Sequence, residues 1–194
     1  LGGEGKPMVL GEEHWEWDHG GDNYVTLIDP NDLDTMYLEG MFGSMARRNL
    51  KTGKNHGIRP GPAPEGRKLR FNWMTPFILS HYGSKTLYAG ANYVFKSENR
   101  GDNWKRISPD LSTNPGPDRQ GDVPFGTITD ISESALKKGL LYAGTDDGQL
   151  HVTRDDGATW TKINNGLPNR WVSRVVASKY DEGTAFVSLT GYRE

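Results

Sequence analysis

Two short segments place an arginine close to a tryptophan, a combination suited to binding sugars. Arg70 lies three residues before Trp73, and Arg170 directly precedes Trp171. An indole face can stack on a sugar ring, and a guanidinium group can hold a carboxylate or a hydroxyl through hydrogen bonds. These four residues are therefore candidate ligand-binding residues for a carbohydrate or an acidic glycan.

The same four residues also have structural explanations. Trp73 and Trp171 stand at the starts of predicted strands, where an aromatic ring commonly packs between neighbouring sheets. Arg70 and Arg170 could form part of a sialidase-like arginine cluster, but a third arginine at an equivalent position is missing. The binding and packing alternatives both remain open at this point.

Carboxylates that could cleave a glycosidic bond are few. Hydrolysis needs two carboxyl groups about 5 to 10 Å apart across the sugar, and the candidates are Asp22 and Asp130. Nothing in the sequence indicates that the two act together, and Asp130 could equally be a channel-lining carboxylate with no catalytic role. His19 is a further ligand-binding candidate beside Asp18 and Asp22, although this Gly-rich stretch also fits an ordinary turn.

The composition excludes several classes of protein. The formal charge is −2, with basic and acidic residues interspersed, so a nucleic-acid partner is not expected. Cysteine is absent, which excludes disulfides and thiolate metal sites, and we predict no metal and no cofactor. No apolar run approaches the ~20 residues of a membrane helix. The 25 glycines and 11 prolines are spread between short apolar runs, which is typical of an all-β protein.

A repeat positions the candidate residues. Tyr88-Ala89-Gly90 recurs 54 residues later as Tyr142-Ala143-Gly144, and Trp104 recurs 56 residues later as Trp160. Each copy divides into four short runs separated by turns, which is the pattern of one antiparallel propeller blade. The strands expected in the two copies are 73–80, 86–91, 93–97 and 103–108, then 126–132, 140–145, 149–153 and 159–164.

The same pattern extends in both directions. Upstream, runs at 24–30, 35–40, 44–50 and 54–59 predict another blade, and downstream 171–178 and 184–190 predict half of one. The expected divisions are a connector or partial blade at 1–21, blades at 22–60, 69–109 and 125–165, and a half blade at 170–194. Three and a half blades cannot close a ring, so we expect more of the same chain or another subunit to complete it.

Both copies of the repeat contain the Asp-box pattern, Ser/Thr-x-Asp/Asn-x-Gly-x-x-Trp. Asp or Asn can bond the amides of its own turn, Gly can take a positive φ, and we expect Trp to bury its ring between neighbouring strands. In the first blade Asn49 and Lys51 take the Ser/Thr and Asp places, so its turn must be held differently. The structural Asp-box residues are Ser97, Asn99, Gly101, Trp104, Thr153, Asp155, Gly157 and Trp160.

On these motifs, and on the stretches 69–80 and 97–111, nearly the whole chain resembles bacterial BNR-repeat proteins, relatives of the sortilin-type and xyloglucanase-type propellers. The resemblance implies a secreted or periplasmic protein, and it places the Asp-box turns on the rim away from the ligand face. Segments leading into each innermost strand lie at the channel mouth, where binding residues collect. We expect a non-catalytic scaffold that binds polysaccharide or protein; the alternative is part of a glycoside hydrolase.

Overall fold

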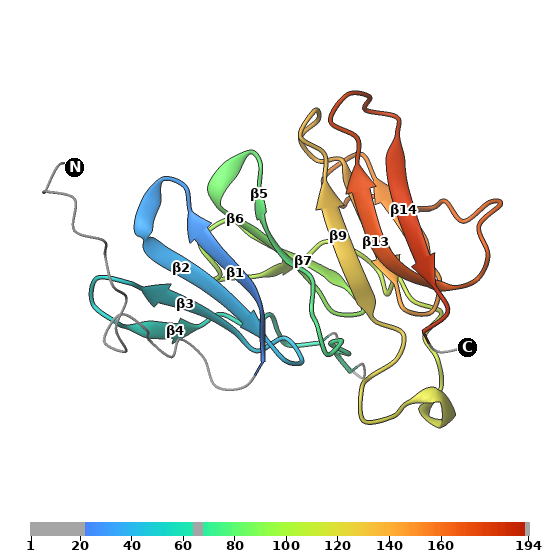
Figure 1. Cartoon of the computed structure of the whole chain (residues 1–194), viewed down its shortest axis with the longest axis horizontal. Coiled ribbons are helices and arrows are strands. Elements are labelled where there is room, and N and C mark those ends of the chain that lie inside the picture. Colours follow the sequence, from blue (N-terminus) through green and yellow to red (C-terminus); the bar gives the residue numbers. More distant parts are fainter. Residues whose placement is uncertain (1–21, 64–67, 193–194) are drawn as a thin grey trace, which may run out of the picture.

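The computed structural model describes residues 22–63 and 68–192, and these residues form consecutive antiparallel sheets. Figure 1 shows the sheets side by side in chain order. The first sheet contains β1 (Asn23–Asp29), β2 (Asp32–Gly40), β3 (Met45–Asn49) and β4 (Asn55–Gly57). The second contains β5 (Phe77–Ser80), β6 (Gly83–Gly90), β7 (Val94–Ser97) and β8 (Lys105–Arg106).

The third sheet repeats this order and the fourth has two strands. The third contains β9 (Ile128–Glu133), β10 (Leu141–Thr145), β11 (Leu150–Thr153) and β12 (Thr161–Lys162), and the fourth pairs β13 (Trp171–Ala177) with β14 (Ala185–Thr190). Apart from a short 3₁₀ helix at Pro117–Arg119, the described residues form no helix. The all-β fold of four-stranded propeller blades is therefore confirmed.

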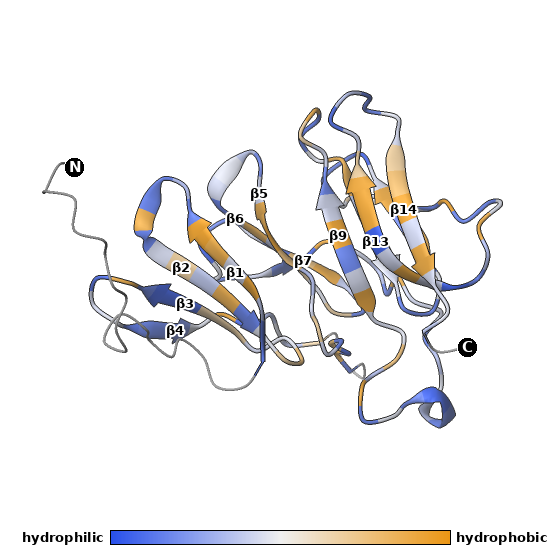
Figure 2. Cartoon of the chain, viewed as in Figure 1, coloured by the Kyte–Doolittle hydropathy of each residue, from blue (hydrophilic) through white to orange (hydrophobic). Residues whose placement is uncertain are grey.

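The sheets pack face to face through apolar cores. Tyr37, Phe77 and Leu87 fill the space between the first and second sheets. Comparable clusters join the second sheet to the third and the third to the fourth, and their central residues are Tyr88, Ile128, Leu141, Tyr142, Val172 and Val175. In Figure 2 the inner strands β5, β9 and β13 carry apolar residues, whereas β3 and β4 at the outside are largely hydrophilic.

The turns that join the third and fourth strands of the second and third blades have the same hydrogen bonds. The Ser97 hydroxyl accepts the Gly101 amide at 2.9 Å, as the Thr153 hydroxyl accepts that of Gly157 at 2.9 Å. Both glycines have φ near +90°, at 88° and 89°, which a side chain would strain. Hydrogen bonds from Thr159 lower the pKa of Asp155 to about 2, so this turn is held by a carboxylate.

The tryptophans of these turns connect neighbouring blades. The indole nitrogen of Trp104 donates to the Ile58 carbonyl at 2.7 Å, and that of Trp160 donates to the Ile107 carbonyl at 2.7 Å. Ile58 and Ile107 each follow the outermost strand of the preceding blade. The rings are half-buried, and they pack against the cores between neighbouring blades.

The rim turn of the first blade is shifted by one residue from the predicted alignment. β3 and β4 pair Arg47 with His56, as β7 and β8 pair Lys96 with Lys105. This register puts Arg48, and not Asn49, at the position of Ser97. The Asn49 side chain nevertheless holds the turn, because it accepts the Thr52 amide at 2.8 Å.

The inner strand of the second blade begins later than predicted. We expected a strand from Trp73, but β5 begins at Phe77, and Met74 makes only an isolated bridge to Met41. The segment 72–76 therefore follows the surface of the first blade before it enters the second sheet.

Candidate functional site

The segments that lead into the inner strands and the hairpins between the second and third strands meet at one end of the blades. Ile128 at the start of β9 pairs with Thr145 at the end of β10, so the segment 124–127 lies beside the hairpin 146–149. We call this end the mouth; in the second to fourth blades it comprises segments 68–76, 113–127, 146–149, 169–171 and 190–192. The rim turns lie at the opposite ends of the strands.

A polar cavity of about 420 Å³ opens at the mouth beside the third blade. Arg119 and Arg170 bring positive charge to it, and Arg119 stacks on the Phe125 ring at 5.1 Å. The predicted residues Arg170 and Trp171 therefore line the same cavity. Its wall is completed by Thr113, Pro115, Phe125, Asp146, Asp147, Asn169 and Thr190.

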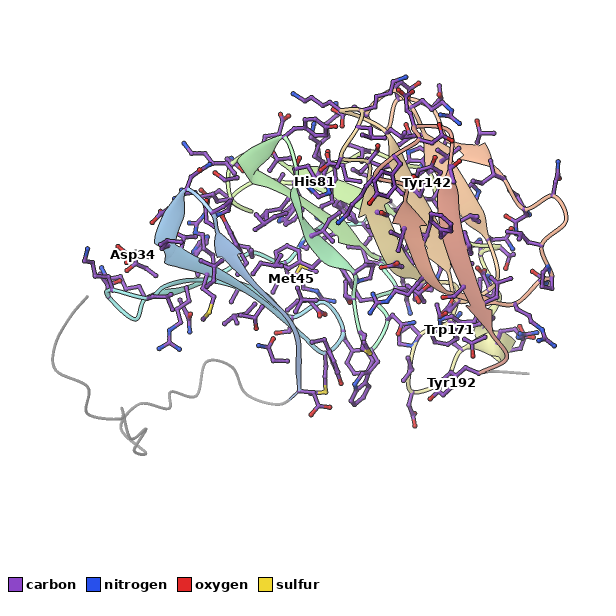
Figure 3. The ribbon with its side chains drawn as sticks, turned by 45° about the horizontal axis from the view of Figure 1, so that its top comes forward. Asp34, Met45, His81, Tyr142, Trp171 and Tyr192 are labelled. Atoms are coloured by element: carbon purple, nitrogen blue, oxygen red, sulfur yellow. The ribbon has the colours of Figure 1, made fainter. Side chains whose placement is uncertain are left out.

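A second cavity of about 540 Å³ adjoins the first, since Trp171 and Thr190 line both. Its wall is more apolar and also includes Trp73, Met74 and Tyr192. The rings of Trp171 and Tyr192 pack edge to face, with centroids 5.2 Å apart, and Figure 3 shows the two side chains together at this end. Trp73 and Trp171, both predicted from the sequence, thus line this second, more apolar cavity.

Trp73 is held from the side of the first blade. Its indole packs edge to face on Phe42, with centroids 4.9 Å apart, and its nitrogen donates to the Tyr24 hydroxyl. The same hydroxyl donates to the Asp22 carboxylate at 2.9 Å. Trp73 remains 37% exposed, so the ring is fixed and still available to a ligand. His19 lies outside the described residues, so its cluster with Asp22 remains a prediction.

Arg70 forms hydrogen bonds and an ion pair with residues of the segments near the mouth. Its guanidinium forms an ion pair with Asp110 at 3.0 Å and donates to the Ser112 hydroxyl at 2.8 Å and the Gly126 carbonyl at 3.1 Å. Its side chain is largely buried. In this arrangement Arg70 fixes the segments beside the first cavity, and it does not line the cavity itself.

Two carboxylates that the sequence analysis did not single out stand at the first cavity. Asp146 is buried, and it accepts the amides of Gly126 and Thr127 at 2.9 and 2.8 Å. Burial raises its pKa to about 6, against the opposing effect of the Thr127 hydrogen bonds. Asp147 accepts the amide and hydroxyl of Thr113, both at 2.7 Å. Both carboxylates are therefore occupied in shaping the mouth.

Asp130 lies apart from the mouth cavities. Its carboxylate accepts the Val175 amide at 2.7 Å and lies 3.4 Å from Arg174, which ties β9 to β13. Burial raises its pKa. Neither Asp22 nor Asp130 lines the two cavities described above, and the two have different hydrogen-bond partners, Tyr24 and Val175.

A sequence signal for the missed mouth residues does exist. Asp146 and Asp147 occupy the hairpin after the Tyr-Ala-Gly strand; Asp146 stands at the place of Asn92 in the second blade, and Asp147 belongs to the two-residue insertion that lengthens this hairpin. Tyr192 follows β14 in a comparable position. Considering these hairpins together with the lead-in segments would have identified all three residues.

Within residues 22–63 and 68–192, no group of three His, Asp or Glu side chains is arranged to hold a metal ion. No helix in this part of the chain has the length and apolar character needed to cross a bilayer.

No protein-family model matches the sequence, and no curated protein matches it. Solved structures do match. The GH74 enzyme of Niastella koreensis matches 84% of this chain with a TM-score of 0.58 and 15% identity. The GH74 xyloglucanase of Xanthomonas campestris matches 84% with a TM-score of 0.59 and 20% identity.

A third similar structure is the extracellular domain of BT4673 from B. thetaiotaomicron, which matches 86% of this chain with a TM-score of 0.55 and 16% identity. This chain spans 27%, 26% and 20% of the three proteins, respectively. At this level of identity the likeness shows a shared fold of propeller blades.

Proposed function

We propose that this chain is a segment of a propeller scaffold that binds a polysaccharide at the mouth without cleaving it. The observation that carries the proposal is the pair of adjoining cavities, in which Trp73, Trp171 and Tyr192 line the apolar part and Arg119 and Arg170 the polar part. Aromatic faces suit sugar rings, and guanidinium groups suit hydroxyls or carboxylates.

The state of the carboxylates favours binding over hydrolysis. A glycoside hydrolase needs an acid and a second carboxylate on either side of the scissile bond. Among the described residues that line the two cavities, Asp146 and Asp147 are the carboxylates, and each accepts several hydrogen bonds from the protein. A carboxylate committed in this way is poorly placed to transfer a proton to a leaving group.

A glycoside hydrolase is the second candidate function, because two of the similar structures are GH74 enzymes. The chain spans about a quarter of each. In this alternative Asp22 is the candidate carboxylate, since it is exposed and accepts a hydrogen bond from the Tyr24 hydroxyl, which Trp73 also contacts.

We also propose the finer family assignment, a BNR-repeat propeller of the sortilin or xyloglucanase type with Asp-box rim turns. The matching hydrogen bonds of the two rim turns support it. A secreted or periplasmic location is part of the same proposal, supported by the likeness to an extracellular domain. We include in the same proposal the division into blades at 22–60, 69–109 and 125–165. It also includes further blades, or another subunit, as the partner that completes the propeller.

The test of binding uses the chain on an array of plant, bacterial and host glycans, with calorimetry on any glycan retained. Trp171→Ala and Trp73→Ala should each weaken binding about tenfold or more, the usual effect of removing a central aromatic contact. Tyr180→Ala is the matched control, because Tyr180 is an exposed aromatic in the β13–β14 turn at the opposite end. Equal loss in all three variants, or no glycan bound, would overturn the proposal.

The enzyme alternative is tested separately by incubating the protein with the same glycans and measuring released sugars. Hydrolysis that Asp22→Asn abolishes would support the alternative, whereas undiminished hydrolysis would remove Asp22 from the mechanism. No hydrolysis by the parent protein would leave the binding proposal standing alone.

A further inference from the structure

Glu39 is a buried carboxyl at a position where the next two blades have glycine. Tyr37 in β2, Tyr88 in β6 and Tyr142 in β10 occupy one repeat position, and the residues two places later are Glu39, Gly90 and Gly144. The Glu39 side chain is 0% exposed. A charged residue type at a fully buried position is unusual and calls for a physical reason.

At Gly90 and Gly144 a side chain would be crowded, because the inner strand of the following blade packs closely on these positions. A Cβ at Gly144 would lie 2.3 Å from Val172 Cγ1, and a Cβ at Gly90 would lie 3.0 Å from Ile128 Cγ2 and 2.7 Å from Pro76 Cγ of its own blade. Ile128 and Val172 cover these glycines, and they are 0% and 1% exposed. The first blade cannot have this arrangement, because the Glu39 side chain takes up the space.

Met74 is the residue of the second blade that corresponds to Ile128 and Val172. Phe77 pairs with Ala89 as Ile131 pairs with Ala143, and Met74 lies three residues before Phe77 as Ile128 lies three before Ile131. Whereas Ile128 and Val172 are buried, Met74 is 51% exposed and lines the 540 Å³ cavity. Met74 therefore does not cover the position of Glu39 as Ile128 and Val172 cover Gly90 and Gly144, and it points into the second cavity instead.

The Glu39 carboxyl also fixes the segment that carries Met74. Its Oε1 accepts the Thr75 amide at 3.1 Å. Its Oε2 is buried and has no hydrogen-bond partner among the described residues. A neutral carboxyl tolerates this site far better than a carboxylate, because an ionised oxygen would be buried without compensation.

The groups around Glu39 do not offset a charge there. Burial raises the pKa of Glu39 to about 8, although the Thr75 hydrogen bonds oppose the shift. Among the residues that the structure describes, Tyr24 of β1 is a titratable side chain that interacts with it, and the negative charge of Glu39 contributes to the raised pKa of Tyr24. The paired residues on β1 and β3 are Val25 and Met45, both apolar.

We infer that Glu39 is a positioning residue for the mouth: it fills the place of the repeat's glycine, holds Thr75 and thereby turns Met74, with the neighbouring Trp73, outward to form the apolar wall of the second cavity. That a ligand uses this wall rests on the proposed function. The shape of the wall is independent of the proposed function, because it follows from the packing of the first and second blades.

Oxidation of methionine by dilute hydrogen peroxide tests the inference without any ligand, because exposed thioethers oxidise before buried ones. In the parent chain, peptide mass spectrometry should show Met74 oxidised at least severalfold faster than the buried internal references Met36 and Met45. In Glu39→Gly, Met74 should move inward over the new glycine, and its rate should fall severalfold toward theirs. A folded Glu39→Gly protein with an unchanged Met74 rate would overturn the inference.

Glu39→Gln provides the test should the glycine variant fail to fold. Above about pH 8 ionisation should loosen the 72–76 segment of the parent chain, so deuterium exchange there should accelerate beyond its intrinsic pH dependence. In Glu39→Gln, which keeps an acceptor for Thr75 and cannot ionise, this extra acceleration should be absent. Identical pH profiles for the two proteins would contradict the inference, and glycan binding has no influence on either measurement.

Discussion

Trp104 and Trp160 show how one residue type joins successive blades. Each indole donates one hydrogen bond to a backbone carbonyl of the preceding blade, at 2.7 Å in both cases. Those carbonyls belong to buried Ile58 and Ile107. A carbonyl at such a site is costly to leave without a donor, so the indole nitrogen matters beyond the apolar area of its ring.

Trp104→Phe and Trp160→Phe should each lower the free energy of unfolding by about 1–3 kcal/mol, from the lost hydrogen bond and the reduced ring contact. Urea denaturation followed by circular dichroism measures the change. Tyr180→Phe is the control, because Tyr180 is almost fully exposed and its substitution should leave the midpoint unchanged. A midpoint for the tryptophan variants equal to the parent's would show that the interblade bond contributes nothing.

His151 in β11 should make the chain less stable in mild acid. Burial lowers its pKa to about 4, and the charge of Lys162 adds to the shift. Between pH 6.5 and 4 the unfolded chain binds a proton at this side chain and the folded chain does not, so stability falls as the pH falls through this range. His151→Gln should flatten that part of the profile, as measured by urea midpoints at pH 7 and pH 5; parallel profiles would contradict the prediction.

At the scale of strands and turns, the repeat predicted most of the structure because each blade reuses one spacing. Strands of the second and third blades lie within a few residues of their predicted bounds. The exceptions have local causes. β5 begins late because the preceding residues contact the first blade, where Met74 bridges Met41 and the Trp73 carbonyl accepts the Phe42 amide. The first rim turn shifts because strand pairing, not residue similarity, sets its register.

The mouth was harder to predict than the blades. Trp73, Arg170 and Trp171 were located from their place before the inner strands, and the structure puts them at the cavities. Asp146, Asp147 and Tyr192 follow the second strands of their blades, and strand pairing brings these positions beside the lead-in segments, so they are found only when both kinds of segment are considered together. Burial of Arg70 among Asp110, Ser112 and Gly126 also depends on contacts far apart in sequence.

The close approach of neighbouring sheets gives a prediction for a single glycine. Gly144→Ala should destabilise the protein by about 1–3 kcal/mol or more, because the added Cβ would meet Val172 Cγ1 at 2.3 Å and the inner strand would have to shift. Gly57→Ala in β4 is the matched control, since nothing lies within 4 Å of its Cβ position. Thermal unfolding of the two variants should separate them by several degrees; equal melting temperatures would rule out tight packing at Gly144.

On the scale of the whole molecule, the face of the fourth sheet differs from the others. Phe186 pairs with Val176 as Tyr142 pairs with Ser132, so Phe186 stands at the position of Tyr37, Tyr88 and Tyr142. Those tyrosines are at most 2% exposed, whereas Phe186 is 66% exposed. The isolated 194-residue polypeptide thus presents apolar surface that the preceding blades cover with the next sheet.

Exposed apolar surface on the fourth sheet should make this polypeptide self-associate as its concentration rises. Sedimentation velocity across a concentration series should show the association, and Phe186→Lys should reduce it. Leu33→Lys is the control, because Leu33 is equally exposed at the start of β2 in the first sheet. Association that persists unchanged in Phe186→Lys would place the contact elsewhere.

The rim turns and the mouth lie at opposite ends of the same strands. Residues that join the blades, such as Gly157 and Trp160, therefore share almost no contacts with residues that line the cavities, such as Arg170 and Trp171. Mutations at sites without shared contacts have nearly additive effects. We expect that such a protein can evolve new ligand preferences by drift in its mouth loops, because most of those substitutions leave the joints between blades intact.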